Sequence, residues 1–136
     1  MDALLLAAQF VEAINLHDVD RVVSLLSPDH RFIDSLGNVV EGRDALRRGW
    51  AFYFGMVPDY KFTINGRFLT AGETGAEVVF TGVVEGSYCF EGTMRPNSAW
   101  STPVAVRAKV AGSLLTEWQV YADNEPIREQ MHAAAG

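Results

Sequence analysis

Helical periodicity marks the first half of the chain, where apolar residues recur at three- and four-residue steps. This pattern predicts three helices, over residues 2–16, over residues 19–26 and from Gly42 to about Phe54. Asp18 is a suitable N-cap for the second helix, because its carboxylate can accept hydrogen bonds from amides of the first turn. Ser27-Pro28-Asp29 should stop that helix, and Gly55 should end the third.

Alternation of apolar and polar residues predicts the strands. They are expected at residues 30–34, 39–40, 60–68, 77–85, 103–110 and 114–123, and a short helix should follow from Asn124-Glu125-Pro126. The run 77–85 is apolar on both faces, which predicts a central strand. The order α-α-β-β-α-β-β-β-β indicates an α+β fold with a mostly antiparallel sheet. Such a sheet twists and curls around its few helices, so its concave side can enclose an apolar pocket for a small molecule.

Composition narrows the classes of function. The 136 residues fit one domain spanning 1–136. With 11 basic and 17 acidic residues the net charge is −6, which argues against nucleic acid as a partner. The apolar start lacks a positively charged region and is interrupted by polar residues at helical spacing, so neither a signal peptide nor a membrane segment is expected. The single cysteine, Cys89, fits a cytoplasmic location.

Asp34 is the first candidate for chemistry, because it closes an apolar strand and shares a face with Phe32. If that face points into the pocket, burial would raise the pKa of the carboxyl group toward values useful in a general base. The alternative is a turn aspartate that accepts hydrogen bonds from the backbone around Ser35 and Leu36.

Asp123 is the second candidate. Alternation places it with Tyr121, Gln119 and Glu117 on one unusually polar face of the last strand, opposite Trp118. That face could surround a ligand with hydrogen-bonding groups. Alternatively it is exposed to solvent, and Asp123 caps the C-terminal helix.

Aromatic residues are numerous for this length, and most should be core. The candidates for substrate contacts are Phe10, Trp50, Tyr53, Phe54, Tyr60, Phe80 and Tyr121, together with Gln119. Buried tyrosine hydroxyls need partners and can donate to a carbonyl oxygen. The three histidines have no spacing typical of a metal site, so neither a metal nor another cofactor is expected.

Several segments, in this order, resemble the nuclear transport factor 2-like superfamily, specifically its SnoaL-like and ketosteroid-isomerase-like branch. They are Phe10-Val11-Glu12-Ala13-Ile14-Asn15 with His17-Asp18-Val19-Asp20, Phe32-Ile33-Asp34 with Gly37, Glu41-Gly42-Arg43-Asp44-Ala45-Leu46, and Trp118-Gln119-Val120-Tyr121-Ala122-Asp123. The resemblance covers nearly the whole chain and implies a cone-like domain with a deep pocket, often dimeric through the outer face of the sheet. The same fold hosts isomerases, cyclases, hydrolases and non-enzymatic modules.

The resemblance also implies roles for individual residues. Asp34 falls at the position of the isomerase general base, and Asp123 resembles the late-strand acid of SnoaL-type polyketide cyclases. The two oxyanion donors of the isomerases correspond to Phe10 and Val104, which cannot donate through their side chains. Losing one such donor typically lowers the rate by about 10²–10³. Limonene epoxide hydrolase pairs a similar aspartate with an Arg-x-Asp motif, which the sequence lacks.

The leading hypothesis is a cofactor-independent isomerase or aldol cyclase acting next to a carbonyl of a small hydrophobic, steroid- or polyketide-like substrate. Asp34 would be the base and Asp123 the second acid or base, while Tyr53, Tyr60, Tyr121 or Gln119 would orient the carbonyl. The alternatives are a non-catalytic module that binds a small ligand or mediates dimerisation and, less favoured, an epoxide hydrolase. A homodimer is expected to bury the outer sheet face, including Trp118, Arg107 and Thr116.

Overall fold

In the computed structural model, which describes residues 3–69 and 76–135, four helices accompany a six-stranded sheet. The helices are α1 (Ala3–Asn15), α2 (Val19–Ser24), α3 (Arg43–Met56) and α4 (Glu125–Ala135). The sheet contains β1 (Leu26–Ile33), β2 (Val39–Glu41), β3 (Lys61–Leu69), β4 (Glu77–Gly86), β7 (Trp100–Ala111) and β8 (Leu114–Ala122). A separate small hairpin joins β5 (Cys89–Phe90) and β6 (Thr93–Met94). The α+β prediction is confirmed.

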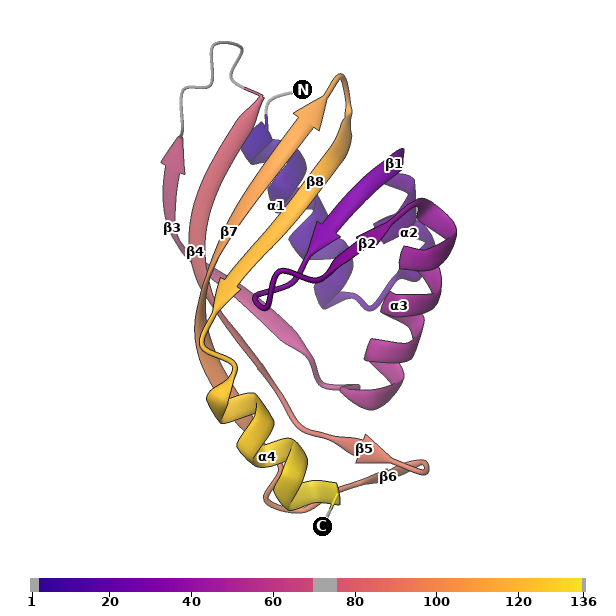
Figure 1. Ribbon diagram of the computed structural model, residues 1–136, viewed down its shortest axis with the longest axis vertical. Coiled ribbons are helices and arrows are strands. Elements are labelled where there is room, and N and C mark those ends of the chain that lie inside the picture. The colour runs from indigo at the N-terminus through magenta and orange to yellow at the C-terminus, as the bar shows by residue number, and fades with distance from the viewer. Residues whose placement is uncertain (1–2, 70–75, 136) are drawn as a thin grey trace.

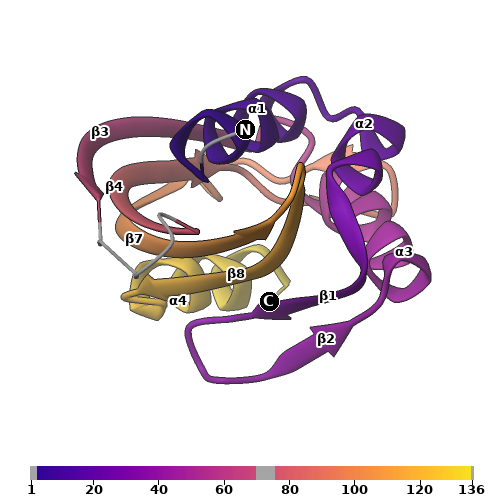
Figure 2. The ribbon, with the colours of Figure 1, turned by 90° about the horizontal axis from the view of Figure 1, so that it is seen from above.

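The large sheet has the strand order β2-β1-β8-β7-β4-β3. All its pairings are antiparallel except that of β1 with β8. β4 lies between β7 and β3, so its position inside the sheet is as predicted from its two apolar faces. The sheet is unclosed and strongly curved, as Figure 2 shows, and α1 packs against β3, β4, β7 and β8. α1 begins near one end of the long axis, and α4 occupies the other (Figure 1).

Several predicted boundaries are wrong: the second helix ends at Ser24 rather than at residue 26, and β7 begins at Trp100 rather than at residue 103. Two further differences have local reasons. The first strand begins at Leu26 rather than His30, and Pro28 fits within it because the pairing with β8 is irregular between Leu26 and Arg31. α3 continues past Gly55 to Met56, and the amide of Val57 then donates to the carbonyl of Tyr53. Residues 70–75, which join the strands predicted at 60–68 and 77–85, lie outside the described residues.

The core forms where α1 meets the sheet. Phe10 of α1 is fully buried, and its ring centroid lies 4.5 Å from that of Trp118, which in turn lies 5.5 Å from Phe80. Full burial of one such ring contributes about 2–3 kcal/mol of hydrophobic free energy. The placement of Trp118 on the outer face was therefore wrong, because the indole is the largest apolar group of β8 and packs inward.

Candidate functional site

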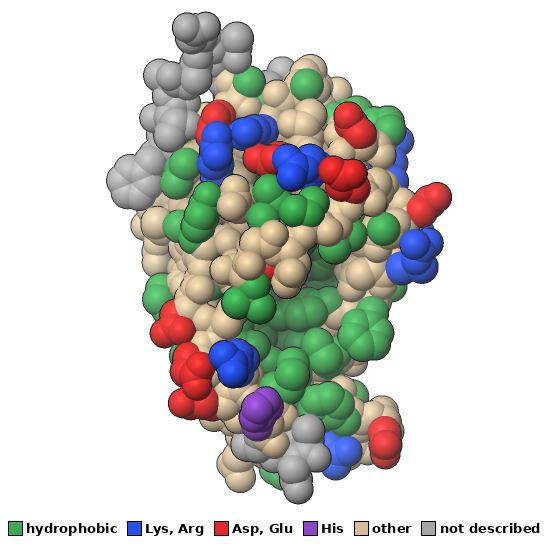
Figure 3. Space-filling view, viewed as in Figure 1, with side chains coloured by type: hydrophobic (Ala, Val, Ile, Leu, Met, Phe, Trp, Pro, Cys, Tyr) green, Lys and Arg blue, Asp and Glu red, His purple; other side chains and the backbone are tan. Residues whose placement is uncertain are grey.

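A cavity of about 440 Å³ opens between the sheet, α3, the β1–β2 turn and α4. Its walls are mainly apolar and include Phe32, Trp50, Phe62, Val104 and Trp118. Figure 3 shows the hollow from the side, with hydrophobic side chains gathered in it. A mainly apolar cavity with a few polar groups is the usual form of a small-molecule site.

The structure brings four of the ten predicted site residues to this cavity. They are Asp34, Trp50, Tyr53 and Tyr60. The last turns of α3 carry Trp50 and Tyr53 inward, and Tyr60 precedes β3 at the same end of the molecule. Asp34 follows β1 directly, at the start of the turn into β2.

Asp34 lines the cavity, and its carboxylate is held by its own turn. Oδ1 accepts hydrogen bonds from the amides of Leu36 and Asn38, each at 2.9 Å, and Oδ2 accepts from the Asn38 side chain at 3.2 Å. Gly37 allows this turn because its φ of 86° lies in the left-handed region. The hydrogen bonds are those expected from the turn interpretation, and the residue that makes them also lines the cavity.

Asp123 has the second of its two predicted environments. The side chain is exposed, and Oδ1 accepts from the amide of Glu125 at 3.0 Å, at the start of α4. It is not among the residues that line the cavity. The structure therefore does not bring the two carboxylates together in one site.

The interpretation of the last strand was inverted. Trp118, Val120 and Ala122 line the cavity, so Gln119 and Tyr121 point to the outer face, where Tyr121 is 50% exposed. Of the two environments predicted for this polar side, the structure shows the exposed one, and the prediction of Gln119 and Tyr121 as substrate contacts is wrong. The apolar side of a strand faces the interior because burial of its side chains is favourable.

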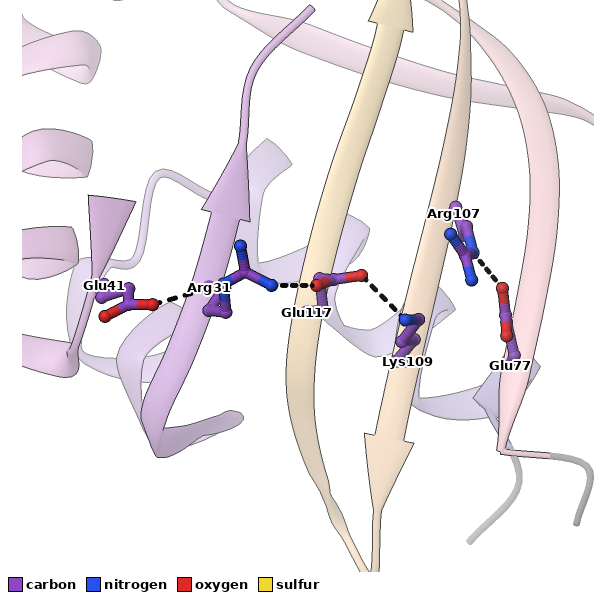
Figure 4. Close-up of polar contacts among 6 residues, drawn as sticks. All are labelled: Arg31, Glu41, Glu77, Arg107, Lys109 and Glu117. Atoms are coloured by element: carbon purple, nitrogen blue, oxygen red, sulfur yellow. Dashed lines mark hydrogen bonds and ion pairs between the residues drawn. The ribbon is translucent and has the colours of Figure 1, made fainter. Parts of the chain in front are cut away.

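Charged residues occupy one end of this outer face. Glu117 lies between Arg31 at 3.1 Å and Lys109 at 3.3 Å, and Arg31 also pairs with Glu41 at 3.3 Å. Figure 4 shows this row across four strands, with a further pair between Arg107 and Glu77 beside it. Arg107 lies on the outer face as predicted from the sequence, and it pairs within its own sheet.

Three predicted contact residues belong to the core and do not line the cavity. Phe10 and Phe80 are fully buried around Trp118. Phe54 is 8% exposed and stacks on the His17 imidazole with ring centroids 4.4 Å apart. These aromatic side chains are buried in the core. Alternation and helical spacing predict that a side chain points inward, but they do not distinguish a core residue from one that contacts a ligand.

The cavity has several polar lining groups that sequence reasoning missed. Ser35 follows Asp34, and its hydroxyl accepts a hydrogen bond of 2.5 Å from the Asn124 side chain, so the β1–β2 turn is tied to the start of α4. Ile127 and Arg128 of α4 also line the cavity. The apolar residues Ile127 and Met131, one helical turn apart, were the available signal that this helix packs against the rest of the molecule.

Burial raises the pKa of the two tyrosines at the cavity. Desolvation raises the pKa of Tyr53 far above its ordinary value, and the neighbouring Tyr60 and Tyr88 raise it further. Desolvation likewise raises the pKa of Tyr60. Both hydroxyls therefore stay protonated, and can donate hydrogen bonds, at neutral and moderately alkaline pH.

Within residues 3–69 and 76–135, no cluster of three or more His, Cys, Asp or Glu side chains is arranged to hold a metal ion. In the same residues, no helix is long and apolar enough to cross a membrane.

The family follows from comparison with known proteins. A model described as the SnoaL-like domain matches residues 7–118. The chain belongs to this family. The family assignment predicted from the sequence is thereby confirmed. The chain matches none of the curated proteins with which it was compared.

Solved structures similar to this SnoaL-like chain share its nuclear transport factor 2-like cone fold. A protein from Shewanella denitrificans, proposed to be a SnoaL-like polyketide cyclase, has 20% identity and a TM-score of 0.79, over 95% of this chain and 96% of that one. A ketosteroid-isomerase-like fold protein from Catenulispora acidiphila, in complex with trimethylamine, has 19% identity and a TM-score of 0.77, over 92% and 90%. IdmH from Streptomyces antibioticus, proposed to be a polyketide cyclase, has 20% identity and a TM-score of 0.74, over 93% and 96%.

Proposed function

We propose that this SnoaL-like protein is a cofactor-independent enzyme that performs acid–base chemistry next to a carbonyl group of a small hydrophobic compound. The observation that carries the proposal is the position of Asp34. Among the described residues, it is the one acidic side chain that lines the apolar cavity. Family membership supports the same class, because similar structures include proposed polyketide cyclases and a ketosteroid-isomerase-like fold.

In this proposal the Asp34 carboxylate removes a proton from the carbon beside the carbonyl. The C–H electron pair moves into the carbonyl group and forms an enolate, while Asp34 becomes a carboxylic acid. An isomerase then returns the proton to the same or a conjugated carbon. A cyclase instead lets the enolate carbon attack a second carbonyl of the same molecule, and the alkoxide that forms takes up a proton, which restores the Asp34 carboxylate when Asp34 is the donor. The hydrogen bonds from Leu36 and Asn38 fix the carboxylate and reduce the reorganisation needed for transfer.

A non-catalytic ligand-binding module is the second candidate. It is favoured by the three hydrogen bonds that hold Asp34 in its own turn and by the position of Asp123, which caps α4 instead of joining the cavity. Phe10, at the position of an isomerase oxyanion donor, is buried in the core. In this case Asp34 is a structural residue at the edge of the cavity.

Hydrogen–deuterium exchange at carbon separates the two candidates. The protein would be incubated in D₂O with a panel of fused-ring and polyketide-like aromatic ketones, and deuterium uptake followed by NMR. We expect uptake beside the carbonyl with wild type, and a decrease of about 10²–10⁴-fold in Asp34→Asn, because a positioned base contributes that factor. Asparagine keeps an oxygen that can accept from Leu36 and Asn38, so the turn should be preserved.

The matched control is Asp29→Asn, since Asp29 is an exposed aspartate of β1, the strand that precedes Asp34, and is not among the residues that line the cavity. It should exchange like wild type. Ligand binding by wild type without exchange, and with equal affinity in Asp34→Asn, would favour the binding module.

A further inference from the structure

Four aromatic rings form a continuous wall of the cavity. They come from α3, the loop before β3 and the start of β7, and they are Trp50, Tyr53, Tyr60 and Trp100. The ring centroids of Trp50 and Tyr53 are 6.3 Å apart, those of Tyr53 and Tyr60 are 5.2 Å apart, and those of Tyr60 and Trp100 are 6.2 Å apart. The first two pairs meet edge to face, so each ring fixes its neighbour.

This wall carries polar groups that the protein leaves without partners. Over residues 3–69 and 76–135, neither the Tyr53 nor the Tyr60 hydroxyl makes a hydrogen bond to another residue. The indole N–H of Trp100 is buried and is also without a partner. By contrast, the hydroxyl of the adjacent Tyr88 donates to the carbonyl of Ile127 at 3.4 Å.

Unpaired polar groups at an apolar cavity are unfavourable unless a ligand or solvent satisfies them. Tyr53 and Tyr60 line the same cavity, and their rings are in contact with each other. Both hydroxyls are protonated at neutral pH, and burial raises their pKa further, so each can donate one hydrogen bond. The Trp100 N–H can only donate. The wall therefore offers donors, and its natural complement is a hydrogen-bond acceptor.

We propose that Tyr53 and Tyr60 form a subsite that donates hydrogen bonds to an acceptor oxygen of the ligand, so that the cavity selects flat apolar compounds carrying a carbonyl oxygen. The flanking rings of Trp50 and Trp100 bind the apolar body beside that oxygen. These four residues carry no charge, which matches a neutral oxygen better than a carboxylate or phosphate. The subsite rests on the proposed function in one respect, namely that the cavity holds a small apolar molecule.

The test uses two probes of the same shape, 2-acetylnaphthalene and 2-isopropenylnaphthalene, in which the ketone oxygen is replaced by a methylene group. Dissociation constants of both would be measured by equilibrium dialysis with wild type, Tyr53→Phe, Tyr60→Phe and Asp34→Asn. Wild type should prefer the ketone. Each Tyr→Phe change should reduce the ratio of the two affinities about fivefold, the factor that one net hydrogen bond contributes.

Tyr121→Phe is the matched control, because its hydroxyl lies on the outer sheet face, and it should leave the ratio unchanged. Asp34→Asn should also keep the ratio, since the subsite does not include the carboxylate. A second readout is the infrared C=O stretch of the bound ketone. It should lie at lower frequency in wild type than in the Tyr53→Phe/Tyr60→Phe double variant, which a purely structural role of the rings would not produce.

A ratio that stays the same in both phenylalanine variants, with an unchanged C=O stretch, would overturn the subsite and leave the proposed function standing. If neither probe binds wild type, the subsite is overturned, and so is the premise on which it rests, that the cavity binds a small apolar molecule. Loss of ketone preference in the tyrosine variants but not in Asp34→Asn would establish the subsite whether or not the protein turns over a ketone.

Discussion

At the scale of single residues, His30 shows how burial controls protonation. Its side chain is 1% exposed in β1, and Nδ1 lies 2.7 Å from the Leu115 carbonyl oxygen. A carbonyl only accepts, so Nδ1 carries the proton in this hydrogen bond. Desolvation lowers the pKa of His30, although the Leu115 carbonyl and the carboxylates of Glu117 and Asp29 oppose that change.

This lowered pKa predicts the direction of one pH effect on stability. The unfolded chain binds a proton at His30 near pH 6.5, whereas the folded protein resists it. The contribution to stability is complete above pH 6.5 and is lost as pH falls below it, at up to about 1.4 kcal/mol per pH unit. Urea unfolding between pH 7.5 and 5 should show a steeper decline for wild type than for His30→Gln.

The control for this prediction is His132→Gln, an exposed histidine near the end of α4. Because the carboxylates titrate in all three proteins, the difference between curves isolates His30. Parallel curves for wild type and His30→Gln would contradict the prediction.

At the scale of elements, two glycines have opposite roles. Gly82 in β4 faces the irregular stretch of β3 between Ile64 and Gly66, and a Cβ there would lie 2.5 Å from the Thr63 carbonyl oxygen. Gly55 lies within α3, and a Cβ there would meet nothing within 4 Å. The first glycine allows two strands to approach closely, while the second only adds flexibility to a helix.

Alanine substitution should therefore change stability in opposite directions. Gly82→Ala is expected to lower the free energy of unfolding by about 1–3 kcal/mol, because the backbone of β3 must shift. Gly55→Ala should raise it by about 0.5–1 kcal/mol, the difference in helix propensity. Urea denaturation at fixed pH measures both. Equal effects of the two changes would show that β3 adapts without strain.

At the scale of the whole molecule, the outer sheet face is the proposed surface for a homodimer. Tyr121, half exposed, lies opposite Ala105 in the sheet, and Ala105 lies opposite Thr81, so uncharged side chains adjoin the row of ion pairs centred on Glu117. Trp118 is not part of this surface, because it packs into the core. A stable dimer of this kind buries roughly 800 Å² on each partner.

Light scattering during gel filtration tests the dimer. We expect twice the monomer mass for wild type at micromolar concentration and a shift to monomer in Tyr121→Asp, because a carboxylate would be buried without a partner. Phe52→Asp is the control, since Phe52 is 72% exposed on α3, away from the sheet face. A wild-type monomer at that concentration would exclude the dimer.

Several parts of the fold could be predicted from local pattern. Periodicity predicts the buried apolar face of α1 and the internal position of β4, and capping chemistry predicts the N-cap at Asp18. The structure shows all three. Asp18 accepts from the Arg21 amide at 3.1 Å, as an N-cap should. The family assignment rested on the order of short sequence segments, such as Phe32-Ile33-Asp34 with Gly37, and it is confirmed.

The candidate site was less predictable, because the direction in which a side chain points depends on the elements that pack against its strand or helix. Alternation showed that Trp118 and Tyr121 lie on opposite faces of β8, but the side that met α1 was decided by packing with Phe10 and Phe80. Asn124 and Arg128 line the cavity because the chain brings the start of the last helix back beside Asp34. They follow Asp34 by about 90 positions in the sequence, so no local pattern indicates this contact.

The sequence by itself determined the elements, the α+β class and the placement of an aspartate at the end of an apolar strand, because these depend on neighbouring residues and on the periods of helix and strand. Only the tertiary structure decided which aromatic rings became core and which became cavity wall. It also decided that Asp123 caps a helix and that two tyrosine hydroxyls meet without partners. These outcomes depend on which segments, far apart in the sequence, pack against each other and bury their side chains. Local sequence pattern does not contain that information.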